Sequence, residues 1–429
     1  MPVTSEKIVS LQPDRPLLIR HLGDYLGGVQ GPLALLVVQI RRGREFGTLF
    51  GFRKLEDVVQ QIAERLGRAC RHSDRILRIG EYEYALILPG LINEGHAVLA
   101  ANKVLRTLAE PLVIDKQRVS MGACIGVALC PDHAKLAEPL LHCAELARAD
   151  AERRGQPFTI YNESASAELA SHWGIENELD QALEGGELET FYQAKISLPD
   201  GQLAGAETLV RWRSPTRGLV PPDKFIPVAT QSGQISALTW SVLNMALQQA
   251  SDWPTRFGPL PVSVNIAPAL LDDPTLVSRV ADAMNVWGVR SNRLILEVTE
   301  SGIMRDPEQS FETLRRLTGT GALISIDDFG TGYSSLANFR NMPVSELKID
   351  KGFVIDMLKN PGDEKIVRVI IDLARTFRLS VVAEGVESAG ILKALAGMQC
   401  DYAQGYYISK PLPADAFVKF IQDYRPPAM

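Results

Sequence analysis

The chain has 429 residues, of which 46% are hydrophobic and 22% are charged. This is the composition of an ordinary globular protein, and it excludes a disordered chain, a collagen and a disulfide scaffold. The net charge of −6 argues against a long nucleic-acid polymer as partner, although metal ions can bring a small phosphorylated ligand to an acidic site. The length fits two domains if one is a (β/α)₈ barrel, which takes ~250 residues.

Cysteines and apolar runs bear on the expected compartment. The five cysteines are irregularly spaced and contain no CxxC pair, so we expect neither a zinc site nor a disulfide framework. The first ten residues lack the apolar stretch of a secretory signal. The longest apolar run, near Leu33–Val38, is far shorter than the ~18 residues of a membrane helix. We therefore expect a cytoplasmic protein with no direct membrane insertion.

The first part of the chain alternates short apolar runs with amphipathic stretches. The runs predict strands at Leu33–Ile40, Tyr84–Leu88 and Val119–Leu129, and the helical spacing of apolar residues predicts helices at Leu55–Cys70 and Ala97–Leu108. This order predicts an α/β sandwich. A small, polar stretch follows, so we expect a first domain at 1–163, a linker at 164–174 and a second domain at 175–429.

In the second part, short apolar runs recur and each leads to a chemically active polar residue. These residues are Glu207, Asn265, Glu297, Asp327 with Asp328, Lys348, Glu384 and, after a weaker run, Gln404. Helical stretches separate the runs, so the pattern predicts a parallel barrel. Because catalytic groups of such barrels lie at the carboxyl ends of the strands, we expect these side chains to meet.

The predicted cluster is composed of hard oxygen donors, without histidine or cysteine. Such donors select Mg²⁺ or Mn²⁺ over zinc or copper. The adjacent Asp327 and Asp328 suit a pair of metals with one bridging carboxylate, and two metals suit in-line displacement at phosphorus. Lys348 is either a hydrogen-bond donor to the attacking water or a buried ion-pair partner of an acidic residue. The glycines of Phe329–Leu336 predict a mobile loop over the site.

The second part resembles the EAL domain, the cyclic di-GMP phosphodiesterase family. The resemblance spans about Ser171 to Tyr424 and rests on seven ordered motifs: GAETLVRW (Gly205–Trp212), SVNIA (Ser263–Ala267), LEVTES (Leu296–Ser301), IDDFGTGYSSL (Ile326–Leu336), LKID (Leu347–Asp350), AEGVES (Ala383–Ser388) and QGYYISKPL (Gln404–Leu412). It implies a modified TIM barrel that hydrolyses cyclic di-GMP to pGpG with two Mg²⁺ or Mn²⁺ ions.

The resemblance also implies roles for single residues. Glu207, Asn265, Glu297 and Asp327 would hold one metal, Asp327 and Asp328 the second, and Glu384 would lie nearby. Lys348 resembles the residue that orients the attacking water, and Glu300 resembles the glutamate that anchors the glycine-rich loop. On the substrate side the resemblance places Gln193, Arg211, Asp350, Glu387 and Gln404. Three residues depart from the family pattern without removing a ligand: Thr208, Ala194 and Thr230.

The first part resembles the GGDEF domain, the diguanylate cyclase fold, from about Leu11 to Asn162. It implies a sandwich around a sheet with antiparallel strands. The signature is broken in RIGEYEYA (Arg78–Ala85), where Tyr82 replaces a metal-binding acid, while Gln39 and Arg41 replace the first metal aspartates. We therefore expect no cyclase activity. Arg71 and Asp74 match the family's RxxD site, and they form either an allosteric nucleotide site or an exposed turn.

These observations predict a metal-dependent cyclic di-GMP phosphodiesterase with an inactive GGDEF domain in a regulatory role. The alternative is a catalytically silent cyclic di-GMP receptor that signals through a partner protein, and a scaffold that binds no nucleotide is a further one. For the first domain, three alternatives stay open: it binds GTP, it binds cyclic di-GMP, or it binds no nucleotide. The resemblance also implies a homodimer.

Overall fold

The computed structural model describes residues 7–28, 32–41, 43, 52–91, 93–114, 117–330 and 342–426. The chain divides into two compact units, Met1–Trp173 and Gly174–Met429. Helix α6 (Glu163–Gly185) runs through the point of division, so the segment 164–174 is helical. Its first turn is capped by Asn162, whose Oδ1 accepts a hydrogen bond from the Ser164 backbone N–H at 2.9 Å.

The first unit is built on a six-stranded sheet in the order β1-β3-β4-β2-β7-β8. Its strands are β1 (Ile8–Ser10), β2 (Leu33–Ile40), β3 (Arg75–Arg78), β4 (Glu83–Pro89), β7 (Ala123–Cys130) and β8 (Phe158–Ile160), and β5 (Leu112–Ile114) pairs with β6 (Gln117–Val119) beside it. Its helices include α1 (Arg15–Gly28), α3 (Phe52–Ala69), α4 (Glu94–Ala109) and α5 (Ala137–Arg153).

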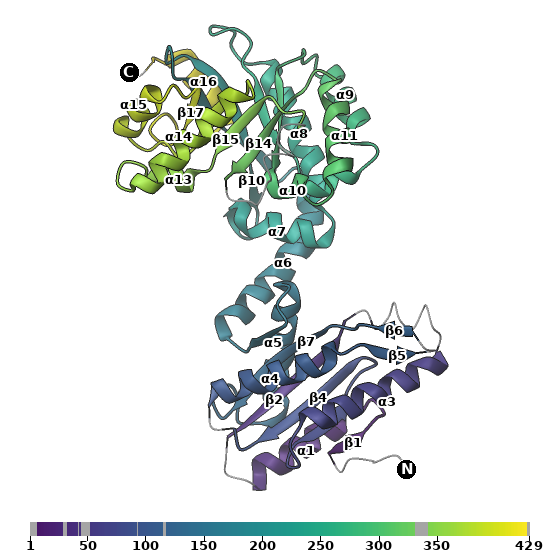
Figure 1. Ribbon diagram of the computed structural model, residues 1–429. Helices are drawn as coiled ribbons and strands as arrows, with labels where there is room; N and C mark the ends of the chain where they lie inside the picture. Colours follow the sequence, from purple (N-terminus) through teal and green to yellow (C-terminus); the bar gives the residue numbers. More distant parts are fainter. Residues whose placement is uncertain are drawn as a thin grey trace. The chain divides into compact units, whose positions relative to one another are not determined.

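Helices cover both faces of this sheet, which explains why β2 is an unbroken apolar run. Leu36 and Val38 belong to a core shared with α3 and α4, whereas Leu35 and Val37 belong to a core shared with α1 and α5 (Figure 1). Strand β2 pairs antiparallel with β4 and with β7. The predicted α/β sandwich with antiparallel strands in its sheet is confirmed.

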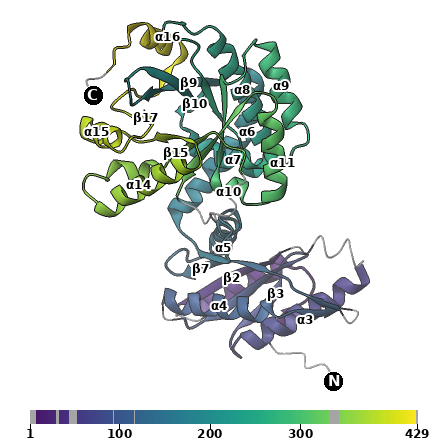
Figure 2. The same cartoon turned by 45° about the horizontal axis from the view of Figure 1, so that its top comes forward.

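The second unit is a closed barrel. Its strands, in the order of the sheet, are β10 (Leu203–Ser214), β12 (Val262–Asn265), β13 (Leu294–Thr299), β14 (Leu323–Phe329), β15 (Glu346–Ile349), β16 (Ser380–Ala383), β17 (Tyr402–Gln404) and β9 (Leu188–Ser197). Neighbours from β10 to β17 are parallel, and β9 closes the ring by pairing antiparallel with both β17 and β10 (Figure 2). The predicted modified TIM barrel is confirmed, but β9 was not among the predicted strands.

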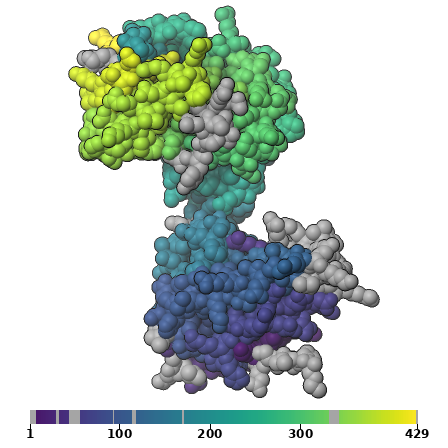
Figure 3. Space-filling model, in the orientation of Figure 1, coloured from purple at the N-terminus to yellow at the C-terminus, as the bar shows by residue number. Residues whose placement is uncertain are grey.

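Helices surround the barrel strands (Figure 1). They include α7 (Pro222–Ser232), α8 (Ile235–Ser251), η1 (Pro268–Asp272), α9 (Leu276–Val286), α10 (Glu300–Ile303), α11 (Pro307–Thr318), α13 (Lys351–Ile355), α14 (Pro361–Thr376), α15 (Ala389–Gly397) and α16 (Ala414–Asp423), with short strands β11 (Gly218–Val220) and β18 (Leu412–Pro413) at the sheet edges. In the space-filling view, the yellow-green segment that holds α13 and α14 covers one side of the second unit (Figure 3). Among the described residues, no helix combines the length and apolar character needed to cross a membrane.

Candidate active site

Lys348 lies at the centre of the carboxyl ends of the barrel strands. Its Nζ is 2.7 Å from Glu384 Oε1, 2.8 Å from Glu297 Oε2, 3.1 Å from Asp327 Oδ1 and 3.6 Å from Glu207 Oε2. These carboxylates come from four different strands or strand ends, so the fold alone brings them together. With Asp328, we call this group the carboxylate cluster: Glu207, Glu297, Asp327, Asp328 and Glu384.

A bulge in β14 aims two consecutive aspartates at one place. In a regular strand, Asp327 and Asp328 would point to opposite faces of the sheet. The pairing of β14 with β15 shifts register between Ile326 and Phe329, and Asp328 has a φ of 55°. As a result, one oxygen each of Asp327, Asp328 and Glu384 lie within 4.8 Å of one another. A shared metal needs this grouping.

Neutral amides complete the side of the cluster around Glu207. Asn265 donates from Nδ2 to Glu207 Oε1 at 3.1 Å, and Gln404 donates from Nε2 to Glu207 Oε2 at 2.5 Å. Gln404 Nε2 also lies 3.2 Å from Gln193 Oε1, while Gln193 donates from its own Nε2 to the Ser409 carbonyl at 3.0 Å. The structure therefore brings Gln193 and Gln404, assigned to the substrate side, into direct contact with the Glu207 end of the cluster.

The cluster carries more negative charge than Lys348 neutralises. Burial raises the pKa of Glu297 well above its usual value, and burial raises that of Glu384 to about 7, with the neighbouring carboxylates adding to both rises against the opposing effect of Lys348. Burial by itself lowers the pKa of Lys348, but the carboxylates around it raise that pKa well above the usual value. The arrangement is one that added cations would stabilise.

These residues fit divalent metal ions. The donors are carboxylate oxygens with one nearby amide, which is the set that Mg²⁺ and Mn²⁺ prefer. Asp327 Oδ1 is buried and has no hydrogen-bond partner among the described residues, although Lys348 Nζ lies 3.1 Å away. A buried carboxylate oxygen in that state is a suitable metal ligand.

Glu300 lies where a loop anchor is expected. It is buried at the start of α10, and its Oε2 accepts a hydrogen bond from the Gly330 backbone N–H at 3.3 Å. Gly330 is the first glycine of the predicted loop. The rest of that loop, from Thr331 to Leu336, lies outside the described residues.

The other residues assigned to the substrate lie around the rim. Arg211 is four residues beyond Glu207 on β10, so both side chains point to the same face of the strand, and its guanidinium lies 5.4 Å from the centre of the Phe191 ring. Asp350 caps α13, because its Oδ1 accepts a hydrogen bond from the Gly352 N–H at 2.9 Å. Burial raises the pKa of Asp328, and the neighbouring carboxylates of Asp327 and Asp350 raise it further. Glu387 is exposed, three residues after Glu384.

A cavity of about 740 Å³ opens beside Asn265. It lies between the middle of β10 and the ends of β12 and β13 on one side and helices α7, α8 and α10 on the other, and its volume is that of a small-molecule site. Two of the three residues that depart from the family pattern, Thr208 and Thr230, line it, whereas Ala194 is fully buried in β9.

The corresponding region of the first unit is filled by contacts within the protein. The Tyr82 ring packs on Gly43, and Arg41 donates from Nη2 to the Gln156 carbonyl at 2.9 Å. Gln39 donates from Nε2 to the Tyr82 carbonyl at 3.3 Å. Glu83, which keeps the family's acid, lies 3.5 Å from Arg148 and 3.8 Å from Arg15.

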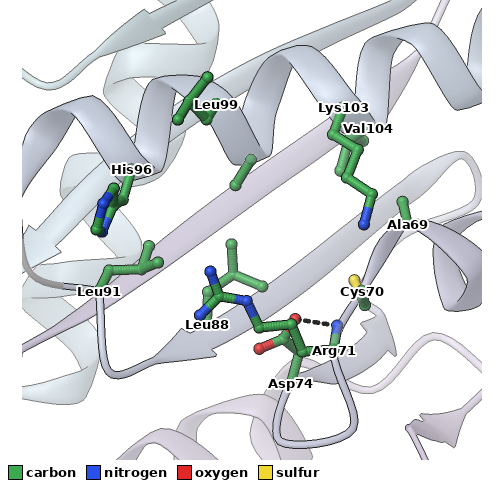
Figure 4. A pocket seen from close by; sticks show the side chains of 11 residues that line it. Ala69, Cys70, Arg71, Asp74, Leu88, Leu91, His96, Leu99, Lys103 and Val104 are labelled. Carbon is green, nitrogen blue, oxygen red and sulfur yellow. Dashed lines mark hydrogen bonds between the residues drawn. The ribbon is translucent and has the colours of Figure 1, made fainter.

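Arg71 and Asp74 lie at the turn after α3, beside a pocket of about 160 Å³. Asp74 is buried, and its Oδ2 accepts from the Arg71 backbone N–H at 2.5 Å, which closes the turn. Figure 4 shows Lys103 extending from α4 and Arg71 from the turn on the other side of the pocket, with the apolar Leu88 and Leu91 also lining it. The pocket is smaller than the usual ~300–1,000 Å³ of ligand sites.

Comparison with known proteins agrees with this architecture. Residues 176–411 match the EAL domain family, and residues 17–157 match the diguanylate cyclase GGDEF domain. The chain belongs to the EAL domain family and carries a GGDEF domain ahead of its EAL domain.

Named relatives share both domains. The chain is 34% identical to the bifunctional diguanylate cyclase/cyclic di-GMP phosphodiesterase MucR of Pseudomonas aeruginosa, over 88% of this chain and 57% of that protein. It is 33% identical to the cyclic di-GMP phosphodiesterase NbdA of the same organism, over 92% of this chain and 50% of that protein. It thus spans only about half the length of these relatives.

A solved structure matches the second unit. The PaMucR phosphodiesterase in complex with c-di-GMP is 39% identical, with a TM-score of 0.55, over 57% of this chain and 99% of that chain.

Sequence reasoning missed three buried polar residues near the site. Ser409 holds β9 through its carbonyl to Gln193 and through its Oγ, which accepts from the Ala194 N–H at 3.1 Å. Lys195 and Glu346 form an ion pair inside the barrel at 2.7 Å. A period-two pattern places Lys195 on the face of Gln193 and Glu346 on the face of Lys348. That the two residues pair follows only from the closed barrel, because β9 and β15 are not neighbours in the sheet.

Proposed function

We propose that the second unit binds two Mg²⁺ or Mn²⁺ ions and hydrolyses cyclic di-GMP to pGpG. One observation carries the proposal: Lys348 Nζ lies within 3.6 Å of four carboxylates at the ends of barrel strands, and Asp327, Asp328 and Glu384 group their oxygens beside it. The names of the relatives MucR and NbdA, and the c-di-GMP in the PaMucR complex, support cyclic di-GMP as the substrate.

Glu207, Asn265, Glu297 and Asp327 are the proposed ligands of one ion. Asp327 and Asp328 are the proposed ligands of the other, with Glu384 beside it. Such ions lower the pKa of bound water and stabilise charge on a leaving oxygen. The hydrogen bonds from Asn265 and Gln404 fix the rotamer of Glu207, so the cluster is held in place before a ligand arrives.

The remaining residues hold the nucleotide and the attacking water. Lys348 presents three N–H donors to the centre of the cluster, and we assign it to the water. Arg211 can bond a phosphate through two parallel N–H groups. Gln193, Gln404, Asp350 and Glu387 contribute further polar contacts to the substrate, and Glu300 anchors the loop that begins at Gly330.

We further propose that the first domain, 1–163, regulates the barrel domain, 175–429, through the segment 164–174, and that it has no cyclase activity. Arg41 places a positive charge, and Tyr82 a buried ring, where a cyclase of this family holds metal. Arg71 and Asp74 are the proposed contacts for a regulatory nucleotide, with Lys103 beside them.

Chromatography of cyclic di-GMP incubated with the full chain tests the activity. The incubations contain Mg²⁺, Mn²⁺ or EDTA, and they are repeated with Glu207→Ala and with Glu312→Ala, an exposed carboxylate on α11. We expect metal-dependent pGpG from the wild type and from Glu312→Ala, and none from Glu207→Ala.

Turnover by Glu207→Ala would contradict the site. If no metal gives product, calorimetry with cyclic di-GMP decides between the alternatives, because a silent receptor binds the nucleotide and a scaffold does not.

A further inference from the structure

A second set of side chains faces the barrel interior next to the carboxylate cluster and Lys348. Side chains two residues apart on a strand share a face, so this set stands two residues before the site residue on each parallel strand and two residues after it on the antiparallel β9. We call this set the lower layer. Its members are Lys195, Gly205, Ser263, Ile295, Ser325, Glu346, Val382 and Tyr402.

This lower layer contains one cation and one anion, and they pair with each other. Lys195 Nζ lies 2.7 Å from Glu346 Oε2, and both side chains are only 6% exposed. Lys195 Nζ also lies 5.2 Å from the centre of the Tyr402 ring. The pair crosses the interior from β9 to β15, which are not neighbours in the sheet.

The Lys195 side chain packs along the neighbouring strand β10 at Gly205. Gly205 is the partner of Lys195 in the β9–β10 register, and its φ of 156° is one that other residues rarely adopt. A Cβ on Gly205 would lie 3.6 Å from Lys195 Cε and 2.9 Å from the Pro261 carbonyl oxygen. The close approach to the Pro261 carbonyl therefore requires glycine here, while the Lys195 stem lies in ordinary van der Waals contact with the Gly205 position.

Glu346 is also a competitor for Lys348. The two residues share a face of β15, about 6.6 Å apart at ~3.3 Å per residue, which is within reach of a lysine side chain. Glu346 Oε1 has no hydrogen-bond partner among the described residues, so it has unused capacity as an acceptor. In the lower layer, Lys195 is the cation that neutralises Glu346.

We propose that Lys195 is a positioning residue for Lys348. By pairing with Glu346, it keeps that carboxylate from drawing Lys348 down, so that Lys348 stays among the four carboxylates above. Lys195 touches neither substrate nor metal in this assignment. The inference rests on the proposed function only for its effect on turnover, because the effect on metal affinity follows from the charges alone.

The test measures two quantities on the full chain carrying Lys195→Met. Turnover of cyclic di-GMP should fall about 10–100-fold in kcat with little change in KM, because Lys348 leaves the site. Affinity for Mn²⁺, measured by calorimetry without nucleotide, should rise about tenfold, because a positive charge leaves the carboxylate cluster. General damage to the barrel would lower both quantities, so the opposite signs identify repositioning.

Two further variants control the experiment. Lys195→Met combined with Glu346→Leu removes the competitor as well, and replacing a buried ion pair by apolar residues is often tolerated, so both quantities should return close to wild type. Lys359→Met, which removes an exposed lysine from an ion pair with Asp356, should change neither.

Weaker or unchanged Mn²⁺ binding in Lys195→Met overturns the proposal, as does a double variant that fails to recover. If the wild type hydrolyses no cyclic di-GMP, the proposed function fails, but the Mn²⁺ measurements still decide the role of Lys195.

Discussion

The two units of this chain treat buried charge in opposite ways. In the barrel, four carboxylates surround Lys348, and burial raises the pKa of Glu297 and Glu384. In the first unit, the polar groups at the positions that match a cyclase site contact other residues of the chain. Arg41 donates a hydrogen bond to the Gln156 carbonyl, and Glu83 lies near Arg148 and Arg15.

We propose that this difference distinguishes a site that binds a ligand from one that no longer does. A cluster of carboxylates with too few cations destabilises the fold, and such clusters are retained where a ligand supplies the missing charge. A site whose groups have found partners within the chain no longer needs a ligand. The contrast predicts that changes in the barrel cost activity, whereas changes in the first unit cost stability.

The largest effect is expected for Asp327→Asn. Asp327 is the residue that the proposed site assigns to both ions, so its loss should lower turnover by roughly 10³-fold, the equivalent of several kcal/mol of transition-state stabilisation. Steady-state hydrolysis of cyclic di-GMP by the wild type and by Asp327→Asn measures this loss of turnover.

The same variant tests the stability half of the comparison. Because the substitution removes one negative charge from a crowded cluster, the unfolding temperature of the variant in EDTA should equal or exceed that of the wild type. The increase in unfolding temperature that Mn²⁺ causes in the wild type should be smaller in the variant. A strongly destabilised Asp327→Asn protein would mean that the carboxylate is held for the fold and not for a ligand.

In the first unit, Tyr82→Asp should cost stability and bring no activity. The ring is buried against Gly43, so its loss leaves a cavity and buries a carboxylate, at about 3 kcal/mol or more. Tyr82→Phe keeps the ring and should stay close to wild type. Denaturant unfolding measures the stability, and incubation with GTP and Mg²⁺ tests for cyclic di-GMP. Synthesis of cyclic di-GMP by a stable Tyr82→Asp protein would contradict this comparison, because the first unit would then still be able to form a catalytic site.

Glu300→Ala should give a smaller loss that separates the loop from the metals. Glu300 is buried and holds the Gly330 N–H, but it is outside the carboxylate cluster. We expect turnover to fall about 10–100-fold while Mn²⁺ affinity is kept. Glu300→Gln retains an acceptor oxygen and should lose less. Equal losses of turnover and Mn²⁺ affinity would place Glu300 with the metal ligands.

Much of the barrel could be predicted because each parallel strand is a short apolar run that stops at a chemically active residue. The strand β9 could not be found in this way. It runs antiparallel, and it directs Gln193 and Lys195 into the barrel, so its interior face is polar and the apolar signal is interrupted. Segment 164–174 was expected as a linker because of its small residues, yet these residues permit a helix, and Asn162 caps it.

At the site, residue types followed from the sequence but their contacts did not. The motifs single out Asp327, Asp328 and Lys348 without indicating the bulge that turns both aspartates to one side. A lysine with four carboxylates around it also depends on strands that are distant in sequence, from Glu207 to Glu384. Long-range geometry of this kind requires the closed barrel.

The smallest effect is expected for Thr208, which stands next to Glu207 on β10 but points to the opposite face. Thr208 is buried, and its Oγ1 has no hydrogen-bond partner among the described residues. Thr208→Val removes that hydroxyl while keeping the shape and should stabilise the fold by about 1 kcal/mol. Thr208→Ala, which restores the family's alanine, also loses a methyl group and should be close to neutral in denaturant unfolding. Turnover should change less than about tenfold in both, since the substitution leaves the carboxylate cluster intact. A larger loss of turnover shared by both variants would mean that the Thr208 hydroxyl contacts a ligand in the 740 Å³ cavity. A buried neutral group without a hydrogen-bond partner would then indicate a binding site, as the crowded carboxylates do.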